Sequence, residues 1–133
     1  MAGSATFNLD KLGINAMVLN IAWVGDASAG TVPATAVPAQ IAKTIKGLSV
    51  VLATVNPSSP APTDGFKITI TDSDGIDVLG GALDGLSSTV SYQATPILVG
   101  SGVKRVTDGT LTFNIADTAV ASSVGTCKLY FTN

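Results

Sequence analysis

The acidic residues are the natural place to look for chemistry in this chain, because all nine are aspartate and the sequence contains neither glutamate nor histidine. Four of them stand directly before glycine: Asp64, Asp74, Asp84 and Asp108. Aspartate caps turns with its short side chain, and glycine supplies the positive φ that such turns need. We therefore expect these carboxylates at chain reversals, where solvent and backbone N–H groups keep them ionised. An acid–base site would instead need a buried carboxyl with a raised pKa.

The segment Asp72–Asp77 has a faint likeness to a calcium-binding loop. Calcium takes about six to eight oxygen ligands, and an EF-hand loop supplies a bidentate Glu at its last position. Counted from Asp72, that position is Leu83, and no helix is predicted before the segment. The pattern therefore favours an Asx-type β-turn between two strands, and it leaves a structural cation at this turn as an open alternative.

Other catalytic and metal-binding sets are missing from the sequence. A serine nucleophile needs a base, and no histidine is present to serve as one. Cys127 is the single cysteine, so it cannot form an internal disulfide, and its place in an alternating strand pattern predicts a core residue. Zinc ligands and a phosphate-binding loop are also missing. The sequence thus assigns no catalytic, cofactor-binding or metal-binding residues, and we do not expect an enzyme.

Composition limits the partners. The 133 residues are 46% apolar and only 12% charged, against a usual charged fraction of about 25%. A surface with so few charges is easily desolvated, which favours protein–protein contact; a β domain with a merely neutral surface is the alternative. With a net charge of −2 and Lys104-Arg105 as the only adjacent basic pair, nucleic acid is not an expected partner. No apolar stretch has membrane-spanning length and no signal peptide is recognisable, so a membrane is not expected either.

Alternating apolar and polar residues predict a β protein with one domain over 1–133. Along 14–24, Met17, Leu19, Ile21 and Trp23 share one face, which we expect to point into the core. Further strands are predicted in the following ranges: 5–9, 41–55, 66–71, 76–79, 89–92, 97–99, 103–106, 111–115 and 127–131. This pattern, without a long helical segment, indicates an all-β fold: an antiparallel, jelly-roll-like β-sandwich of about eight or nine strands with long proline-containing loops.

Three segments are candidates for contacts with other molecules. Residues 1–12 could form an N-terminal arm, 27–40 reads as an extended loop interrupted by Pro33 and Pro38, and 56–63 is a stiff proline-rich loop. Low charge and limited flexibility reduce the entropy lost on docking. For the segment 27–40, packing against its own domain is an equally good interpretation.

Two alternating segments near the C-terminus, Asp108–Ile115 and Gly125–Phe131, predict an antiparallel hairpin. Their pattern resembles that of small tailed-bacteriophage virion structural proteins, of the capsid decoration or cement type. The resemblance covers these residues closely and the rest of the chain in general character. It implies a jelly-roll or related sandwich that binds the major capsid protein lattice. It also implies self-association as a homodimer or homotrimer, and a place on the capsid surface of a virion assembled in the host cytoplasm.

Two other functions stay open. One is another virion component, such as a tail-tube, head-fibre or baseplate subunit. The other is a β module that binds carbohydrate or a cell surface. Sugar-binding modules usually expose aromatic platforms, whereas Trp23 lies in an apolar strand and is expected in the core.

Overall fold

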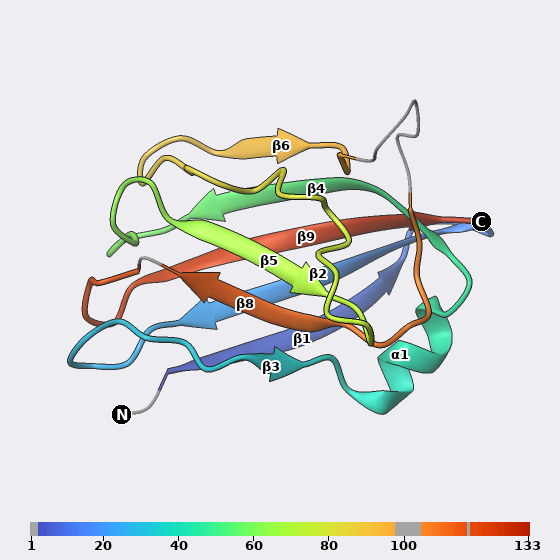
Figure 1. Cartoon of the computed structure of the whole chain (residues 1–133), viewed down its shortest axis with the longest axis horizontal. Helices are drawn as coiled ribbons and strands as arrows, with labels where there is room; N and C mark the ends of the chain where they lie inside the picture. Colours follow the sequence, from blue (N-terminus) through green and yellow to red (C-terminus); the bar gives the residue numbers. More distant parts are fainter. Residues whose placement is uncertain (1–2, 98–104, 117) are drawn as a thin grey trace.

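The protein is described by a computed structural model over residues 3–97, 105–116 and 118–133. These residues form two antiparallel sheets packed face to face (Figure 1). The larger sheet has the order β1-β2-β9-β4-β6, with β7 also paired to β4, and the smaller sheet has the order β3-β8-β5. The prediction of an all-β antiparallel sandwich is confirmed. The strands are β1 (Ser4–Lys11), β2 (Ala16–Val24), β3 (Thr35–Ala36), β4 (Ser49–Pro57), β5 (Lys67–Thr71), β6 (Tyr92–Ala94), β7 (Arg105–Val106), β8 (Thr112–Ala116) and β9 (Val124–Thr132).

The core lies between the two sheets, where each contributes the apolar side of its alternating strands. Trp23 is only 1% exposed, and its ring lies 6.1 Å from the ring centroids of both Phe66 and Phe113. The predicted core face of β2 is confirmed at Leu19, Ile21 and Trp23, whereas Met17 at the start of the strand is only half-buried. Such burial of large apolar side chains is the main stabilising contribution in a fold of this size.

The predicted C-terminal hairpin is wrong, because β8 and β9 belong to different sheets. β8 pairs with β3 and β5, while β9 lies in the middle of the larger sheet between β2 and β4. Both strands bury one face in the same core from opposite sides, as Phe113 and Leu129 show. Alternation reveals which face of a strand is buried, but it does not reveal which strand lies beside it.

The single strand predicted over 41–55 is also wrong, because its first part is the helix α1 (Ala39–Ile45). Pro38 precedes the helix and accepts a 2.9 Å hydrogen bond from the Ala42 N–H, a position where proline is compatible with a helix start. Spacing by four residues puts Ile41 and Ile45 on one face, which packs on the core. Gly47, with φ of +85°, follows the helix and redirects the chain into β4.

Residues 1–12 are not a free arm in the part that the structure describes. β1 pairs with β2 along its whole length, from Ser4 opposite Val24 to Lys11 opposite Met17, and forms an edge of the larger sheet. The segment 27–40 packs against its own domain: Val32 and Val37 are buried, and the Val37 N–H donates to Leu111 O at 2.8 Å.

The short strands predicted in the middle of the chain differ in part from the structure. Residues 76–79 provide only an isolated bridge, between Asp77 and Thr71, and the strand predicted over 89–92 is found at 92–94 as β6. Residues 98–99 and 103–104 of the strands predicted over 97–99 and 103–106 lie outside the described residues, while 105–106 form the short strand β7.

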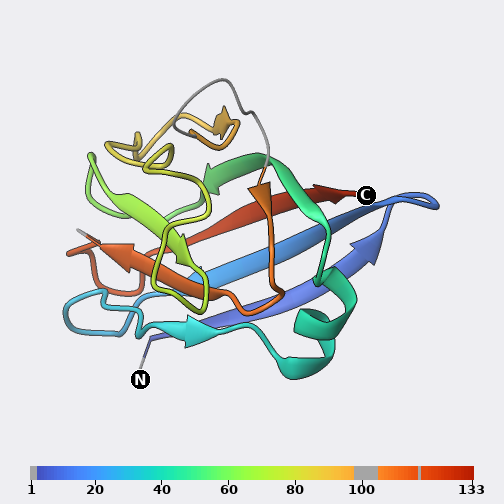
Figure 2. The same ribbon diagram turned by 45° about the vertical axis from the view of Figure 1, so that its right-hand side comes forward.

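The smaller sheet covers one face of the larger sheet, and α1 lies at one end of the sandwich (Figures 1 and 2). The opposite face of the larger sheet, named here the outer face, carries the side chains that point away from β5 and β8.

Candidate functional site

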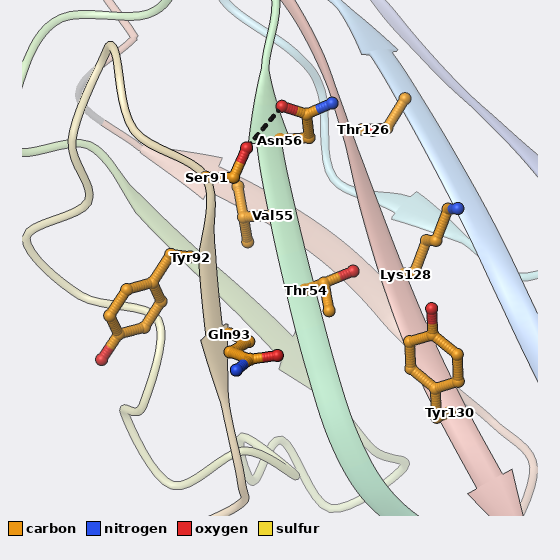
Figure 3. A pocket seen from close by; sticks show the side chains of 9 residues that line it. All are labelled: Thr54, Val55, Asn56, Ser91, Tyr92, Gln93, Thr126, Lys128 and Tyr130. Carbon is orange, nitrogen blue, oxygen red and sulfur yellow. Dashed lines mark hydrogen bonds between the residues drawn. The ribbon is translucent and has the colours of Figure 1, made fainter.

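A shallow hollow of about 440 Å³ lies on the outer face, over β4, β6 and β9 (Figure 3). Its lining combines hydroxyl, amide and phenol groups. The residues that line it are Thr54, Val55, Asn56, Ser91, Tyr92, Gln93, Thr126, Lys128 and Tyr130.

Strand alternation places most of these side chains. In β9, Thr126, Lys128 and Tyr130 alternate with residues that are fully buried on the core side. Gln93 of β6 joins them because it lies directly opposite Thr54 of β4. The hollow therefore forms where three strands of the sheet present their polar sides together.

The wall of the hollow is held by one hydrogen bond across two segments. Ser91 Oγ donates to Asn56 Oδ1 at 2.7 Å and so ties the residue before β6 to the end of β4. Figure 3 shows Gln93 turned toward Thr54, whereas Tyr92 points away from the sheet on the other side of β6. Tyr130 stands on β9 with its hydroxyl directed toward Lys128.

The electrostatics of the hollow are simple. Among its lining residues only Lys128 carries a charge, and none is a carboxylate. The arrangement offers hydrogen-bond donors and acceptors and an aromatic ring, which are groups suited to binding.

The hollow continues into a polar row that crosses β1, β2, β9, β4 and β6 of the larger sheet. Strand register sets Asn8, Asn20, Lys128, Thr54 and Gln93 side by side, from β1 to β6. At the β1 end of the row, Asn20 Nδ2 donates to Asp10 Oδ2 at 2.9 Å. The outer face is thus a continuous surface of mostly neutral polar groups.

The aspartates predicted at turns are found there. Asp72 Oδ1 accepts hydrogen bonds from the Asp74 N–H at 2.9 Å and the Ile76 N–H at 3.1 Å, which is the geometry of an Asx turn. Asp77 Oδ1 accepts from Ile70 and Leu79, each at 3.1 Å. The turn interpretation of Asp72–Asp77 is therefore confirmed.

Two other turn aspartates hold their loops through charge-assisted hydrogen bonds. The Ala29 N–H, together with those of Ser28 and Gly30, lowers the pKa of Asp26 below its ordinary value of 3.8. The Ser73 hydroxyl, followed by the Thr110 N–H, lowers the pKa of Asp108. Both carboxylates are kept ionised by donors that favour the charged form.

Cys127 is a core residue, as predicted. Its side chain is 0% exposed, and burial raises the pKa of the thiol to about 12. A nucleophilic cysteine needs a thiolate at neutral pH, so this thiol is a small apolar packing group.

The contact segments predicted from the sequence contribute to this face unequally. Asn56, at the start of the predicted loop 56–63, lines the hollow. The predicted arm 1–12 contributes Asn8 and Asp10, which lie at the β1 end of the polar row. The segment 27–40 contributes no lining residue. The β9 members could have been found from the alternation in 125–131, whereas Gln93 and Ser91 required the strand order.

Within the described ranges 3–97, 105–116 and 118–133, no group of three or more Cys, Asp, Glu or His side chains comes together as a metal site would require. The helix found in these ranges, α1, has 7 residues, and none is long and apolar enough to cross a bilayer.

Comparisons with known proteins do not assign the chain to a family. No protein-family model matches it, and no curated protein matches its sequence.

Proposed function

We propose that the chain is a non-enzymatic bacteriophage virion structural protein of the capsid decoration type, which binds the major capsid protein lattice through its outer face. The observation that carries the proposal is the row of polar groups that crosses the larger sheet from Asn8 to Gln93, in which Lys128 is the one charged member. The resemblance of the C-terminal sequence to such virion proteins also supports the proposal. It rests on the residues of the two segments and not on the predicted hairpin, which the strands do not form.

A regular lattice demands a rigid surface that is easily desolvated. The outer face rests on strands whose other side is packed in the core, fully along β9 and partly along β1, so their backbone loses little freedom on docking. Neutral hydroxyl and amide groups can exchange hydrogen bonds with water for hydrogen bonds with a partner, without the large desolvation penalty of a buried charge. A homo-oligomer of the chain could bind several lattice positions at once, and several weak contacts made together would give high avidity.

The test is a titration of the purified protein onto empty capsids of the virus that encodes it. We expect saturable binding with a fixed stoichiometry. Binding to purified tails and not to capsids would instead place the protein elsewhere in the virion, in a tail tube or baseplate, and a capsid binding curve that never saturates would contradict the proposal.

A pair of matched variants asks whether the outer face makes the contact. Thr54→Arg puts a large cation in the middle of the polar row, beside Lys128. Thr69→Arg places the same side chain in the middle of β5, where the half-buried Thr69 alternates with the buried Ile68 and Ile70 on the outside of the smaller sheet. We expect T54R to weaken capsid binding by about tenfold or more and T69R to leave it within about twofold, since a misplaced charge at an interface costs several kcal/mol.

The hollow supports a second candidate, a carbohydrate-binding module. Tyr130 offers a ring, while Gln93, Asn56 and Lys128 offer side-chain hydrogen-bond partners around the same space. Titration of neutral oligosaccharides, followed by amide chemical shifts, separates the two functions. Shifts confined to these residues, with no capsid binding, would favour the sugar-binding candidate.

A further inference from the structure

The two sheets have four edges, and within the described residues three of them are short or covered. At one edge of the larger sheet, β6 has 3 residues and β7 has 2, and β3 at an edge of the smaller sheet has 2. The β5 edge is covered by the segment 77–86, through a Val78 N–H to Ile70 O hydrogen bond of 2.8 Å and an Ile68 N–H to Leu83 O hydrogen bond of 2.9 Å. β1 is different: it has 8 residues and contains no proline.

Strand register shows which backbone groups of β1 face outward. The Leu12 N–H donates to Ala16 O at 2.8 Å, and these residues lie directly opposite each other in the β1–β2 register. In an antiparallel ladder, hydrogen-bonded pairs alternate with pairs that make no hydrogen bond. The residues of β1 hydrogen-bonded to β2 are therefore Ser4, Thr6, Asn8 and Asp10.

The other β1 residues direct their N–H and C=O groups away from β2. The other side of β2 gives the same alternation of backbone hydrogen bonds. The Asn133 N–H donates to Asn15 O at 3.1 Å, so the odd-numbered residues of β2 direct their backbone N–H and C=O groups toward β9 and the even-numbered ones toward β1. No backbone hydrogen bond joins this side of β1 to another described segment. The residues with these outward backbone groups are Ala5, Phe7, Leu9 and Lys11.

We propose that this edge pairs with β1 of a second copy of the chain, antiparallel and about a two-fold axis at Asn8. In that register Phe7 lies opposite Leu9 of the partner subunit, and Ala5 lies opposite Lys11 of the partner subunit. All four residues with outward backbone groups then find hydrogen-bonding partners. A two-fold interface of this kind uses the same surface on both subunits and closes as a dimer.

The side chains of β1 are complementary to themselves in this register. On the outer face, Thr6 lies opposite Asp10 of the partner subunit, so a hydroxyl meets a carboxylate. Asn8 meets Asn8 of the partner subunit, where two amides can exchange hydrogen bonds. On the core side, Phe7 and Leu9 are only partly buried in one copy, and pairing would extend their apolar contacts. No like charges lie directly opposite, an arrangement that would destabilise the pair.

The dimer joins two larger sheets into one. Two paired strands bury less than the roughly 1,200 Å² of a stable interface, so the association is expected to be reversible and to depend on concentration. The inference does not depend on capsid binding, because it follows from the exposed edge alone.

Charge variants at one exposed position test both the edge and the register. Thr6→Asp sets two carboxylates opposite each other, twice per symmetric dimer, whereas Thr6→Lys sets a cation opposite Asp10 of the partner subunit. By sedimentation equilibrium we expect a concentration-dependent wild-type dimer, a dissociation constant raised by about 2- to 30-fold in T6D, and no weakening in T6K. Thr89→Asp, exposed at the far side of the sheet next to β6, is the control for added charge and should match the wild type.

Compensation and hydrogen exchange complete the test. The double variant T6D/D10K should recover the wild-type dissociation constant. The Phe7 and Leu9 amides should exchange rapidly in dilute protein and slowly at high concentration, while the Thr6 and Asn8 amides stay protected in both. A monomer at every concentration, or a dimer with equal affinity in T6D and T6K, would overturn the proposal; a monomer that instead captures an extended peptide at β1 would contradict the second copy as the occupant.

Discussion

A single added methyl group at Gly125 should destabilise the sandwich, because this glycine lies against the central tryptophan. Gly125 stands directly opposite Trp23 in the β2–β9 ladder. A Cβ at this position would lie 2.5 Å from Trp23 Cη2 and would also collide with Cζ2 of the same ring. The ring is 1% exposed and is flanked by Phe66 and Phe113, so it has no free space to move into.

The magnitude follows from overpacking. Forcing extra methyl groups into a packed core costs typically about 1–3 kcal/mol, and the reduced freedom of the unfolded chain returns about 0.4–1 kcal/mol. The middle of these two ranges leaves an expected loss of about 1–2 kcal/mol of unfolding free energy in G125A. In a domain of this length that corresponds to a melting temperature lowered by roughly 3–8 °C. Gly13→Ala is the control, since a Cβ there meets nothing within 4 Å, and it should change stability by less than about 0.5 kcal/mol.

A second substitution tests whether the ring is the cause. Trp23→Phe removes the ring atoms that the added Cβ would strike, so G125A should cost less in the W23F background, with a coupling energy of about 0.5–3 kcal/mol. Urea unfolding followed by far-UV circular dichroism measures all four proteins with one signal. Stability of G125A equal to the wild type, or additive costs in the double variant, would refute this account of the core.

Three further predictions concern the thiol, a turn carboxylate and the sheet edge. The pKa of Cys127 is raised to about 12 in the folded protein from an ordinary 9.0, so its contribution to stability is present below pH 9 and is lost as the pH rises toward 12. C127A should therefore flatten the alkaline part of a plot of unfolding free energy, measured in urea, against pH. An unchanged plot would argue against a buried thiol. The lowered pKa of Asp26 gives the opposite dependence: its contribution to stability is present above pH 3.8 and falls as the pH drops through the lower pKa of the folded state. D26N should therefore lessen the fall of the melting temperature at acid pH. The same fall in D26N and the wild type would contradict the hydrogen-bonded carboxylate. Thr6→Pro, which removes an N–H directed at Ala22, should cost about 1–3 kcal/mol more in urea unfolding than Ala5→Pro, whose N–H faces outward; equal losses would show that the phase of β1 is misassigned.

The sequence is informative about which side of each strand is buried. The alternation in β2, β5 and β9 predicts their core faces because solvent and core lie on opposite sides of a sheet, and a two-residue period records this directly. The turn role of Asp72 was also predictable, since an Asx turn is made by a side chain and its own neighbouring backbone.

Sheet order could not be predicted in the same way. β8 and β9 are consecutive and both alternate, yet the chain crosses between sheets from one to the other. The pairing of β9 with β2 and β4 depends on contacts between residues far apart in the chain, which a local pattern does not contain. For the same reason the hollow, which brings Gln93 beside Thr54, was not predictable as a site.

The helix α1 was missed because its segment is short and rich in β-branched residues. Ile41, Thr44 and Ile45 favour strands, but Pro38 fixes the backbone before the helix and Gly47 allows the chain to leave it. Tertiary packing of Ile45, which is 0% exposed, then outweighs local preference.

Electron cryomicroscopy of empty capsids saturated with the protein tests the central claim most directly. Our account predicts density for the sandwich at a repeated lattice position, with Thr126, Lys128 and Tyr130 turned toward the shell and the β5 side turned toward solvent. Bare capsids at saturating protein, or density whose β5 side faces the shell, would contradict it.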